Sequence, residues 1–411
     1  MPHRIASRRA RAGFAALLAS LATLGPFSID AYLPAFDGIR ASLGASPLEI
    51  QQTLSGYLLA FGFMFLFHGA LSDTFGRRPV ILTALVAYAL ASLGAALTAS
   101  VGGLILWRIV QGLSVGAGMV VGRAMIRDLL EPEDAQRLMS LVTLFFGLAP
   151  AVAPVIGGWL FSELGWRSVF WFLTAVGFLL FAVSWRFLPE THPPANRQPF
   201  HVLALLKGYE EVGVNRRFLL LSLAAGFNFN AFFLYIVSAP VFLGTHLGLG
   251  PRQYAWLFIP CIVGIMAGSQ LSGRAAGRLA PRDTVRYAYV FMAVAALANL
   301  AYALAAWPSL PWAVIPIMVF GIGFAMAMPS ITLTTLELFP TRRGMAASLQ
   351  GFVSGMVNTV TAGVISPALS SRPLSLALGM AGLLLLGMAS WLGYLRMRPP
   401  LSATGAFRRP A

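Results

Sequence analysis

Two charged residues, Asp30 and Arg108, stand inside otherwise apolar stretches of this chain. A charged side chain at the centre of a bilayer costs at least about 2.5 kcal/mol, so such residues face a protein interior, pair, or mark a functional site. Asp30 is the sole carboxylate well inside any predicted span, which makes it the candidate for proton coupling, with Arg108 as its partner. Both lie roughly 9 Å below the same membrane surface, at about 1.5 Å of helix rise per residue. Two alternatives stay open: Asp30 reaches outer water at a helix end, and Arg108 anchors backbone carbonyls.

The composition explains which elements must position these charges. Of 411 residues, 58% are hydrophobic and 10% charged, whereas soluble domains carry about 25% charged residues. A transmembrane helix needs about 20 apolar residues, and this rule predicts an all-α integral membrane protein with twelve transmembrane helices. The predicted spans are Gly13–Phe36, Ile50–Leu71, Pro79–Thr98, Gly102–Ala124, Leu138–Phe161, Trp166–Leu188, Phe218–Leu243, Tyr254–Gly273, Val285–Ala306, Trp312–Leu336, Met345–Leu369 and Leu374–Leu395.

The net charge of +15 follows from the loops between these spans. Basic residues concentrate in cytoplasmic loops of membrane proteins, and most of the 29 Lys and Arg residues fall on the side that holds the N-terminus. The predicted outer side has only Arg40, Arg167, Arg252 and Arg372. This distribution predicts that both termini are cytoplasmic, and it explains the charge without any nucleic acid as partner.

A Pro-rich polar stretch divides the chain. It predicts an N-terminal bundle over 1–188, a cytoplasmic linker over 189–217 and a C-terminal bundle over 218–411, with six spans in each bundle. The two halves repeat each other in parallel, because Leu71-Ser72-Asp73 has its counterpart in Leu271-Ser272-Gly273. Two repeats related in this way form one large class of secondary transporters.

The loop between spans two and three reads Gly-Ala-Leu-Ser-Asp-Thr-Phe-Gly-Arg-Arg. Its marked positions are Gly69, Asp73, Gly76, Arg77 and Arg78. A glycine permits the tight turn, and the aspartate can cap a helix or pair with an arginine. The loop resembles the signature of the major facilitator superfamily. The resemblance covers essentially the whole chain and implies a conformational switch at this loop, where the alternative is a short turn with solvated arginines.

Span five contains two prolines and several glycines, more than lipid packing requires. Its marked positions are Gly147, Pro150, Pro154, Gly157 and Gly158. Prolines kink a helix and glycines allow close helix approach. The pattern resembles the antiporter motif of drug:proton antiporters, most of all the bicyclomycin-resistance (Bcr/CflA) branch. It departs at Ala153, where the general motif has glycine, and a plain kinked packing helix is the alternative.

Two further segments carry the same resemblance. Asp30-Ala-Tyr-Leu-Pro resembles the first helix of that family, and Arg108 with Gln111 resembles the arginine motif of the superfamily's fourth helix. The resemblance implies proton-coupled efflux of small hydrophobic or amphipathic compounds. Its implied partners are the substrate and protons, in the lipid bilayer of a bacterial inner membrane, with the protein as a monomer.

The predicted substrate cavity is apolar and aromatic, which suits weakly polar ligands. Its candidate residues are Tyr32, Tyr57, Phe61, Asn228 and Tyr235. Lipid-facing positions are the alternative for any single aromatic residue. Asn228 and Asn230 are both costly in lipid, and because they lie on different faces of one helix, we expect only one of them to face the cavity.

Other functions find less support in the residues. A proton symporter that imports a sugar would show more polar groups within the spans, and one that imports an organic acid would show a second buried cation. An embedded enzyme needs a nucleophile and a base or metal ligands, and neither pattern is present. The sequence indicates no metal site and no cofactor, since its one cysteine, Cys261, stands alone and no phosphate-binding loop occurs.

Overall fold

In the computed structural model, residues 8–130 and 132–397 are described, and for residues 8–12, Asn196 and several positions between 132 and 148 only the backbone path. All regular elements in these ranges are helices. Ten are long and apolar enough to cross a membrane, and a pair bent by 51° makes an eleventh span. Helix α7, with 33 residues, is long enough to be another. The chain is therefore a multi-pass membrane protein, consistent with the twelve predicted spans.

The spans of the first half follow the predicted order. They are α1 (Arg8–Asp30) continued by a 3₁₀ turn (Leu33–Ala35) and α2 (Phe36–Leu43), α3 (Pro47–Met64) with α4 (His68–Phe75), α5 (Arg77–Leu97), α6 (Val101–Leu129), α7 (Pro132–Leu164) and α8 (Arg167–Phe187). We call the end of the molecule at which α5 begins the inner end, and the opposite end the outer end, after the predicted orientation.

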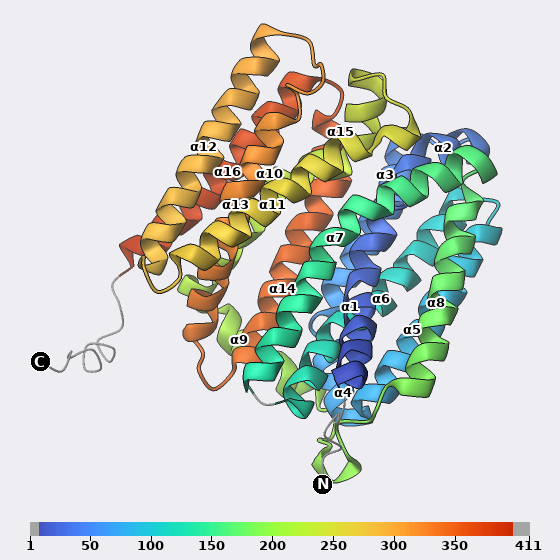
Figure 1. Cartoon of the computed structure of the whole chain (residues 1–411), viewed down its shortest axis with the longest axis vertical. Helices are drawn as coiled ribbons and strands as arrows, with labels where there is room; N and C mark the ends of the chain where they lie inside the picture. The colour runs from blue at the N-terminus through green and yellow to red at the C-terminus, as the bar shows by residue number, and fades with distance from the viewer. Residues whose placement is uncertain (1–7, 131, 398–411) are drawn as a thin grey trace, which may run out of the picture.

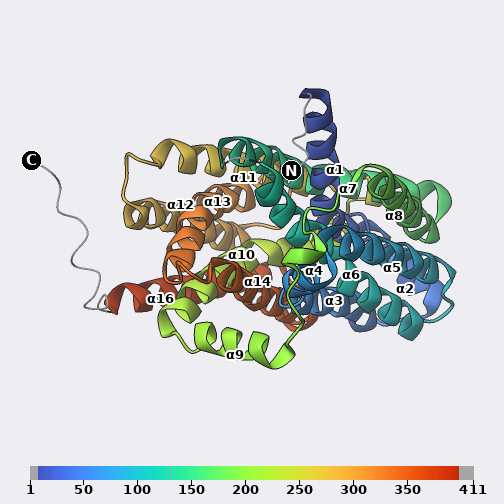
Figure 2. The same ribbon diagram turned by 90° about the horizontal axis from the view of Figure 1, so that it is seen from below.

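The second half repeats this arrangement. Its spans are α10 (Arg216–Val237) continued by a π-helical turn (Pro240–His246), α11 (Ala255–Ala275), α12 (Pro281–Ala305), α13 (Ile315–Glu337), α14 (Arg343–Val360) continued by a π-helical turn (Thr361–Ile365) and α15 (Ser366–Leu369), and α16 (Pro373–Arg396). Figures 1 and 2 show the halves side by side, blue to green and yellow to red.

Local sequence sets where several spans begin. At the start of α3, the Glu49 amide donates to Ser46 Oγ and the Glu49 carboxylate accepts from the Ser46 amide, a reciprocal cap that satisfies exposed backbone donors. Ser100 caps α6 and Asn215 caps α10, each through a side-chain oxygen that accepts from backbone amides of the first turn. These caps lie next to the predicted span starts.

The linker contains a helix that the sequence did not predict. The Pro-rich stretch contains only a 3₁₀ turn (Pro194–Asn196), but α9 (Val202–Gly213) follows it. Its packed face joins Val212 to Phe218 and Ala346 in a small apolar cluster. Tertiary packing stabilises this short helix, since isolated helices of such length are marginal in water.

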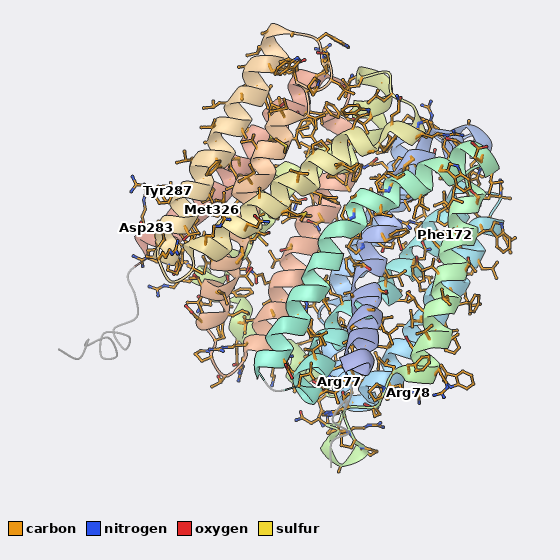
Figure 3. The ribbon with its side chains drawn as sticks, in the orientation of Figure 1. Arg77, Arg78, Phe172, Asp283, Tyr287 and Met326 are labelled. Atoms are coloured by element: carbon orange, nitrogen blue, oxygen red, sulfur yellow. The ribbon has the colours of Figure 1, made fainter. Side chains whose placement is uncertain are left out.

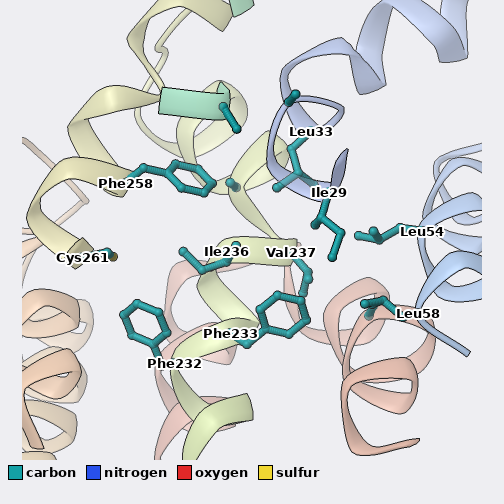
Figure 4. Close-up of a cluster of buried hydrophobic side chains, with 14 of the residues drawn as sticks. Ile29, Leu33, Leu54, Leu58, Phe232, Phe233, Ile236, Val237, Phe258 and Cys261 are labelled. Atoms are coloured by element: carbon teal, nitrogen blue, oxygen red, sulfur yellow. The ribbon is translucent and has the colours of Figure 1, made fainter. Parts of the chain in front are cut away.

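The two halves meet along a buried apolar seam toward the outer end (Figure 4). Ile29, Leu33, Leu54 and Leu58 from the first half face Phe233, Ile236, Val237 and Phe258 from the second. Polar contacts lie beside it, because Gln51 Nε2 donates to the Val237 carbonyl at 3.5 Å and Gln52 Nε2 to the Gly363 carbonyl at 3.4 Å. Helices α7 and α11 converge at this end and diverge toward the inner end (Figure 1).

Candidate functional site

Arg108 on α6 is the centre of a buried polar cluster in the first half. Its side chain is fully buried, and its guanidinium carbon lies 4.5 Å from the ring centroid of Tyr32 and 4.2 Å from that of Tyr57. Nη1 donates to Gln111 Oε1 at 2.9 Å. Two aromatic faces and an amide oxygen thus replace the water that a guanidinium would otherwise bind, and cation–π contacts of this kind are strong when desolvated.

The hydroxyl groups of the cluster fix this cage. Tyr57 donates to the Gly25 carbonyl at 2.9 Å, Tyr32 shares a 2.6 Å hydrogen bond with Thr53, and Ser28 shares one of 2.6 Å with Tyr88. Each buried hydroxyl therefore has a partner, which holds the rings in place. The cage joins α1, α3, α5 and α6 into one unit.

Asp30 lies close to this cage in sequence but makes no ion pair with Arg108. It is the last residue of α1 and its exposed fraction is 4%. Among the described residues, no carboxylate lies within ion-pair distance of Arg108, and its Nε and Nη2 have no hydrogen-bond partner in the protein. The alternative in which Arg108 anchors backbone carbonyls is represented by one long hydrogen bond, which Arg108 Nη1 donates to the Ser28 carbonyl at 3.5 Å. In this conformation Arg108 therefore has two N–H groups that are free to donate hydrogen bonds to a carboxylate.

Helix α7 connects the Asp30 region to the second half through two adjacent glycines. A Cβ on Gly157 would overlap the backbone of Ala31, the residue after Asp30, and a Cβ on Gly158 would overlap the carbonyl of Pro251. Both glycines are thus required for close approach. Pro150 and Pro154 lie within the same helix, whereas the surroundings of Gly147 are outside the described part of the chain.

Near the outer end of α7, a second contact joins the halves. Glu163 and Arg252 form an ion pair, and Arg252 follows Pro251 directly. Both side chains are largely exposed, so the pair is a surface interaction. The sequence placed Arg252 on the outer side but did not pair it with Glu163, because the contact depends on how the two halves meet.

The loop between α4 and α5 forms a charge cluster at the inner end, where Figure 3 labels Arg77 and Arg78. Arg77 is buried and its Nη1 donates to Asp73 Oδ1 and Ser72 Oγ, each at 2.5 Å, while its Nε donates to Asp128 Oδ2 at 3.2 Å. Gly76 has φ of 99°, a value that favours glycine. The loop is therefore more than a turn with solvated arginines, since Arg77 ties α4 and α5 to the end of α6.

The linker also contacts this loop. Glu190 accepts from the amides of Arg77 and Arg78, at 3.0 and 3.3 Å, where a carboxylate meets the N-terminus of α5 favourably. Arg78 Nη2 donates to the Trp185 carbonyl at 2.6 Å, and Gly69 lies in α4. Sequence reasoning missed Asp128 and Glu190 as members of the cluster. For Glu190 the available signal was its isolation as an acidic residue in the Pro-rich part of the linker, whereas Asp128 stands near Glu131, Glu133 and Asp134 and gave no such signal.

The candidate cavity residues fall into two groups. Tyr32 and Tyr57 belong to the Arg108 cage, and Phe61 packs against Tyr57, with ring centroids 6.2 Å apart. Asn228 donates to Tyr289 at 3.0 Å, and Tyr235 accepts from Asn299 at 2.7 Å. These last two side chains point into the second half and not toward the first.

Asn230 takes the position nearer the junction of the halves. Its Nδ2 donates to Asn358 Oδ1 at 2.8 Å, and Asn358 lies on α14, which packs against α3 of the first half. The two asparagines of α10 thus face different neighbours, because positions two residues apart lie on different sides of a helix. Asn230 was not among the predicted cavity residues.

Comparisons with known proteins agree with this architecture. The Major Facilitator Superfamily model matches residues 16–367. The chain is 30% identical over 366 residues to a bicyclomycin resistance protein homologue of Haemophilus influenzae, covering 86% of this chain and 88% of that protein. It is also 30% identical over 380 residues to multidrug resistance protein D of Escherichia coli, covering 90% and 93%.

Solved structures give the same fold. A bacterial homologue of the human lysosomal transporter Spinster, in an inward-facing and unoccupied conformation, matches with a TM-score of 0.70 at 18% identity, covering 94% of this chain and 97% of that one. A D-xylose–proton symporter matches with a TM-score of 0.70 at 14% identity, covering 96% and 98%. At such identities the likeness concerns the fold alone. With the matched family model and the relatives above, this chain belongs to the Major Facilitator Superfamily.

Proposed function

We propose that this protein is a drug:proton antiporter that exports small hydrophobic or amphipathic drugs or metabolites from a bacterial cell. The observation that carries the proposal is the position of Asp30, a buried carboxylate at the end of α1 whose neighbour Ala31 touches Gly157 of α7. The relatives named for bicyclomycin and multidrug resistance support export.

Protonation of Asp30 is the coupling step. A proton removes the charge on a buried carboxylate and so changes the free energy of one conformation relative to the other, which is the only way a ligand shifts such an equilibrium. When Asp30 is ionised, its carboxylate accepts hydrogen bonds from the free Nε and Nη2 groups of Arg108. When a proton or a cationic substrate occupies Asp30, Arg108 returns to the cage of Tyr32, Tyr57 and Gln111.

Helix α7 transmits this change between the halves. Gly157 contacts the segment after Asp30, and Gly158 contacts Pro251 of the second half. A shift of the α1 end therefore reaches the outer contact through one rigid helix. The bundles over 1–188 and 218–411 move as two bodies joined by the linker 189–217, and the conformation described here is closed at the outer end.

The protein acts as a monomer in the inner membrane with both termini in the cytoplasm, and its partners are the substrate, protons and lipid. The loop cluster of Asp73, Arg77 and Asp128 then lies on the cytoplasmic side. There it governs the rate of switching and not the choice of substrate.

Purified protein in liposomes tests the proposal. Vesicles with an imposed proton gradient should exclude a fluorescent lipophilic drug in the wild type, and addition of drug should release protons. Asp30→Asn should abolish the proton release while the protein remains folded in the membrane. Undiminished proton exchange in this variant would show that Asp30 is not the coupling residue. If the gradient instead drives accumulation of the drug, with drug and proton moving in the same direction, the protein is a symporter.

A further inference from the structure

The turn between α11 and α12 differs from its counterpart in the first half in where its arginine lies. Both turns contain a glycine with positive φ followed directly by an arginine, Gly76 with Arg77 and Gly277 with Arg278. Arg77 is buried and pairs with two carboxylates. Arg278 is exposed, and the carboxylate of Asp73 has no counterpart beside it, since a glycine takes that position. The second half therefore leaves this arginine at the surface.

Two more arginines extend this charge along α12. Arg282 and Arg286 are four residues apart, so they are neighbours on one side of the helix, and both are exposed. In the described part of the chain the ion pairs join other residues, and none of these three arginines takes part in one. Asp283 is the nearby carboxylate, in the first turn of α12, where a negative charge suits the helix N-terminus. We call Arg278, Arg282 and Arg286 the α12 arginine cluster.

The cluster lies where the hydrocarbon meets the headgroups. Helix α12 has 25 residues, or about 37 Å at 1.5 Å per residue, whereas the hydrocarbon core is about 30 Å thick. Tyr287 is 51% exposed, and Figure 3 shows it with Asp283 at the outer edge of α12. Exposed tyrosines of membrane spans gather at the membrane–water interface. Tyr287 therefore marks this boundary, and Arg282 and Arg286 lie at the depth of the lipid phosphates.

The same side of α12 continues outward as an apolar stripe. Val290, Val294 and Leu297 have exposed fractions of 56%, 58% and 66%. At 3.6 residues per turn, all three lie within about 80° of Arg286 around the helix. In Figure 1, α12 forms the edge of the second half, so this stripe faces the lipid. A phosphate on the arginines and an acyl chain on the stripe are two parts of one phospholipid molecule.

We infer that the α12 arginine cluster binds the phosphate of an anionic phospholipid of the inner leaflet, whose acyl chain lies on the apolar stripe. Guanidinium groups bind phosphate through paired N–H donors, and basic sites at the cytoplasmic ends of spans bind anionic headgroups. The general excess of basic residues in cytoplasmic loops accounts for the side of the membrane, but not for three unpaired arginines next to one lipid-facing stripe. Three arginines against Asp283 leave an excess of positive charge, which favours a lipid with a net negative charge over a zwitterionic one.

Native mass spectrometry of the purified protein tests this, with phosphatidylglycerol and phosphatidylcholine as probes. The wild type should bind its first phosphatidylglycerol several-fold more tightly than its first phosphatidylcholine. Arg282→Gln together with Arg286→Gln should weaken the binding of phosphatidylglycerol about tenfold and that of phosphatidylcholine much less. The matched control is Arg186→Gln together with Arg396→Gln, which removes the same charge from the last turns of α8 and α16 and should bind both lipids as the wild type does.

Three results would overturn the inference: equal binding of the two lipids by the wild type, unchanged binding of phosphatidylglycerol in the α12 variant, or an equal loss in the control, which would mean that only total charge matters. If the double variant fails to fold, Arg278→Gln replaces it. Thermal melting in detergent separates lipid from free phosphate. Phosphatidylglycerol should raise the melting temperature of the wild type, and inorganic phosphate should not. An equal rise with phosphate alone would identify a site for the ion and not for a lipid. None of these readouts requires transport.

Discussion

Gly62 of α3 and Gly355 of α14 face each other across the two halves so closely that a Cβ on either would overlap the Cα of the other. Glycines allow such approach between membrane helices, where van der Waals packing and not the hydrophobic effect drives association. The contact lies inward of the outer seam, on the same helix pair that carries Gln52 and Gly363. The two halves are therefore in direct backbone contact at these glycines.

Replacement of Gly355 should disturb this contact between α3 and α14. In Gly355→Ala, the added methyl group has no free space and must push α3 and α14 apart, so we expect the rate of efflux to fall about tenfold, a change of about 1.4 kcal/mol in the barrier. Gly382→Ala on α16 is the control, because a Cβ there meets nothing within 4 Å. Counterflow in liposomes gives both rates. Wild-type transport in Gly355→Ala would show that the contact is not maintained during the cycle.

The Arg108 cage predicts a difference between two conservative variants. Arg108→Lys keeps the charge but loses the planar group between Tyr32 and Tyr57. The free energy of unfolding of this variant should therefore fall by about 2 kcal/mol. Tyr57→Phe keeps the ring and loses only the bond to the Gly25 carbonyl, worth about 1 kcal/mol. Melting of purified protein in nanodiscs compares them. A larger loss in Tyr57→Phe would contradict the cage as the main anchor of the guanidinium.

The coupling of Asp30 and Arg108 requires a double-mutant cycle. Because no ion pair joins them in this conformation, Asp30→Asn and Arg108→Ala should add within about 0.5 kcal/mol in melting experiments. Their effects on proton-driven efflux should be clearly non-additive if the two side chains meet in the other state, as proposed. Additive effects on transport as well would leave Asp30 to act alone.

The loop cluster predicts a uniform effect on transport. Asp73→Asn and Asp128→Asn each remove one of the two carboxylates that hold Arg77, so each should slow every substrate by a similar factor. Their combination should be less than additive because they share one arginine. Rates for three chemically different drugs measure this. A changed ranking of substrates at unchanged overall rate would assign the loop to recognition.

The outer ion pair predicts a shift between conformations. Glu163→Arg should repel Arg252 and favour opening of the outer end, and the swap Glu163→Arg with Arg252→Glu should restore closure. The effect should be at most about 1 kcal/mol and should weaken in high salt, since both side chains are exposed. Distances between spin labels on the outer ends of the halves give the populations. No recovery in the swapped variant would mean that the apolar seam and the close contact at Gly158 close this end without the ion pair.

The sequence by itself determined the membrane fold and most span positions. Lengths of about 20 apolar residues are imposed by the bilayer, so hydropathy located α5, α6, α8, α11, α12, α13 and α16 closely. It also identified Asp30, Arg108 and the loop residues as unusual, because each departs from what lipid or a plain turn requires. The cost of a buried charge is a property of the residue and its depth, and both can be read from the chain.

Tertiary structure alone decided which residues meet. Arg108 contacts Tyr32 and Tyr57 and not Asp30, because helix rotation places two rings nearer to it than the carboxylate, and depth along a span says nothing about rotation. Asp128 and Glu190 join Arg77 from distant segments for the same reason. The helix α9 escaped prediction because its stability comes from packing on α10 and α14, which no local pattern of 12 residues records.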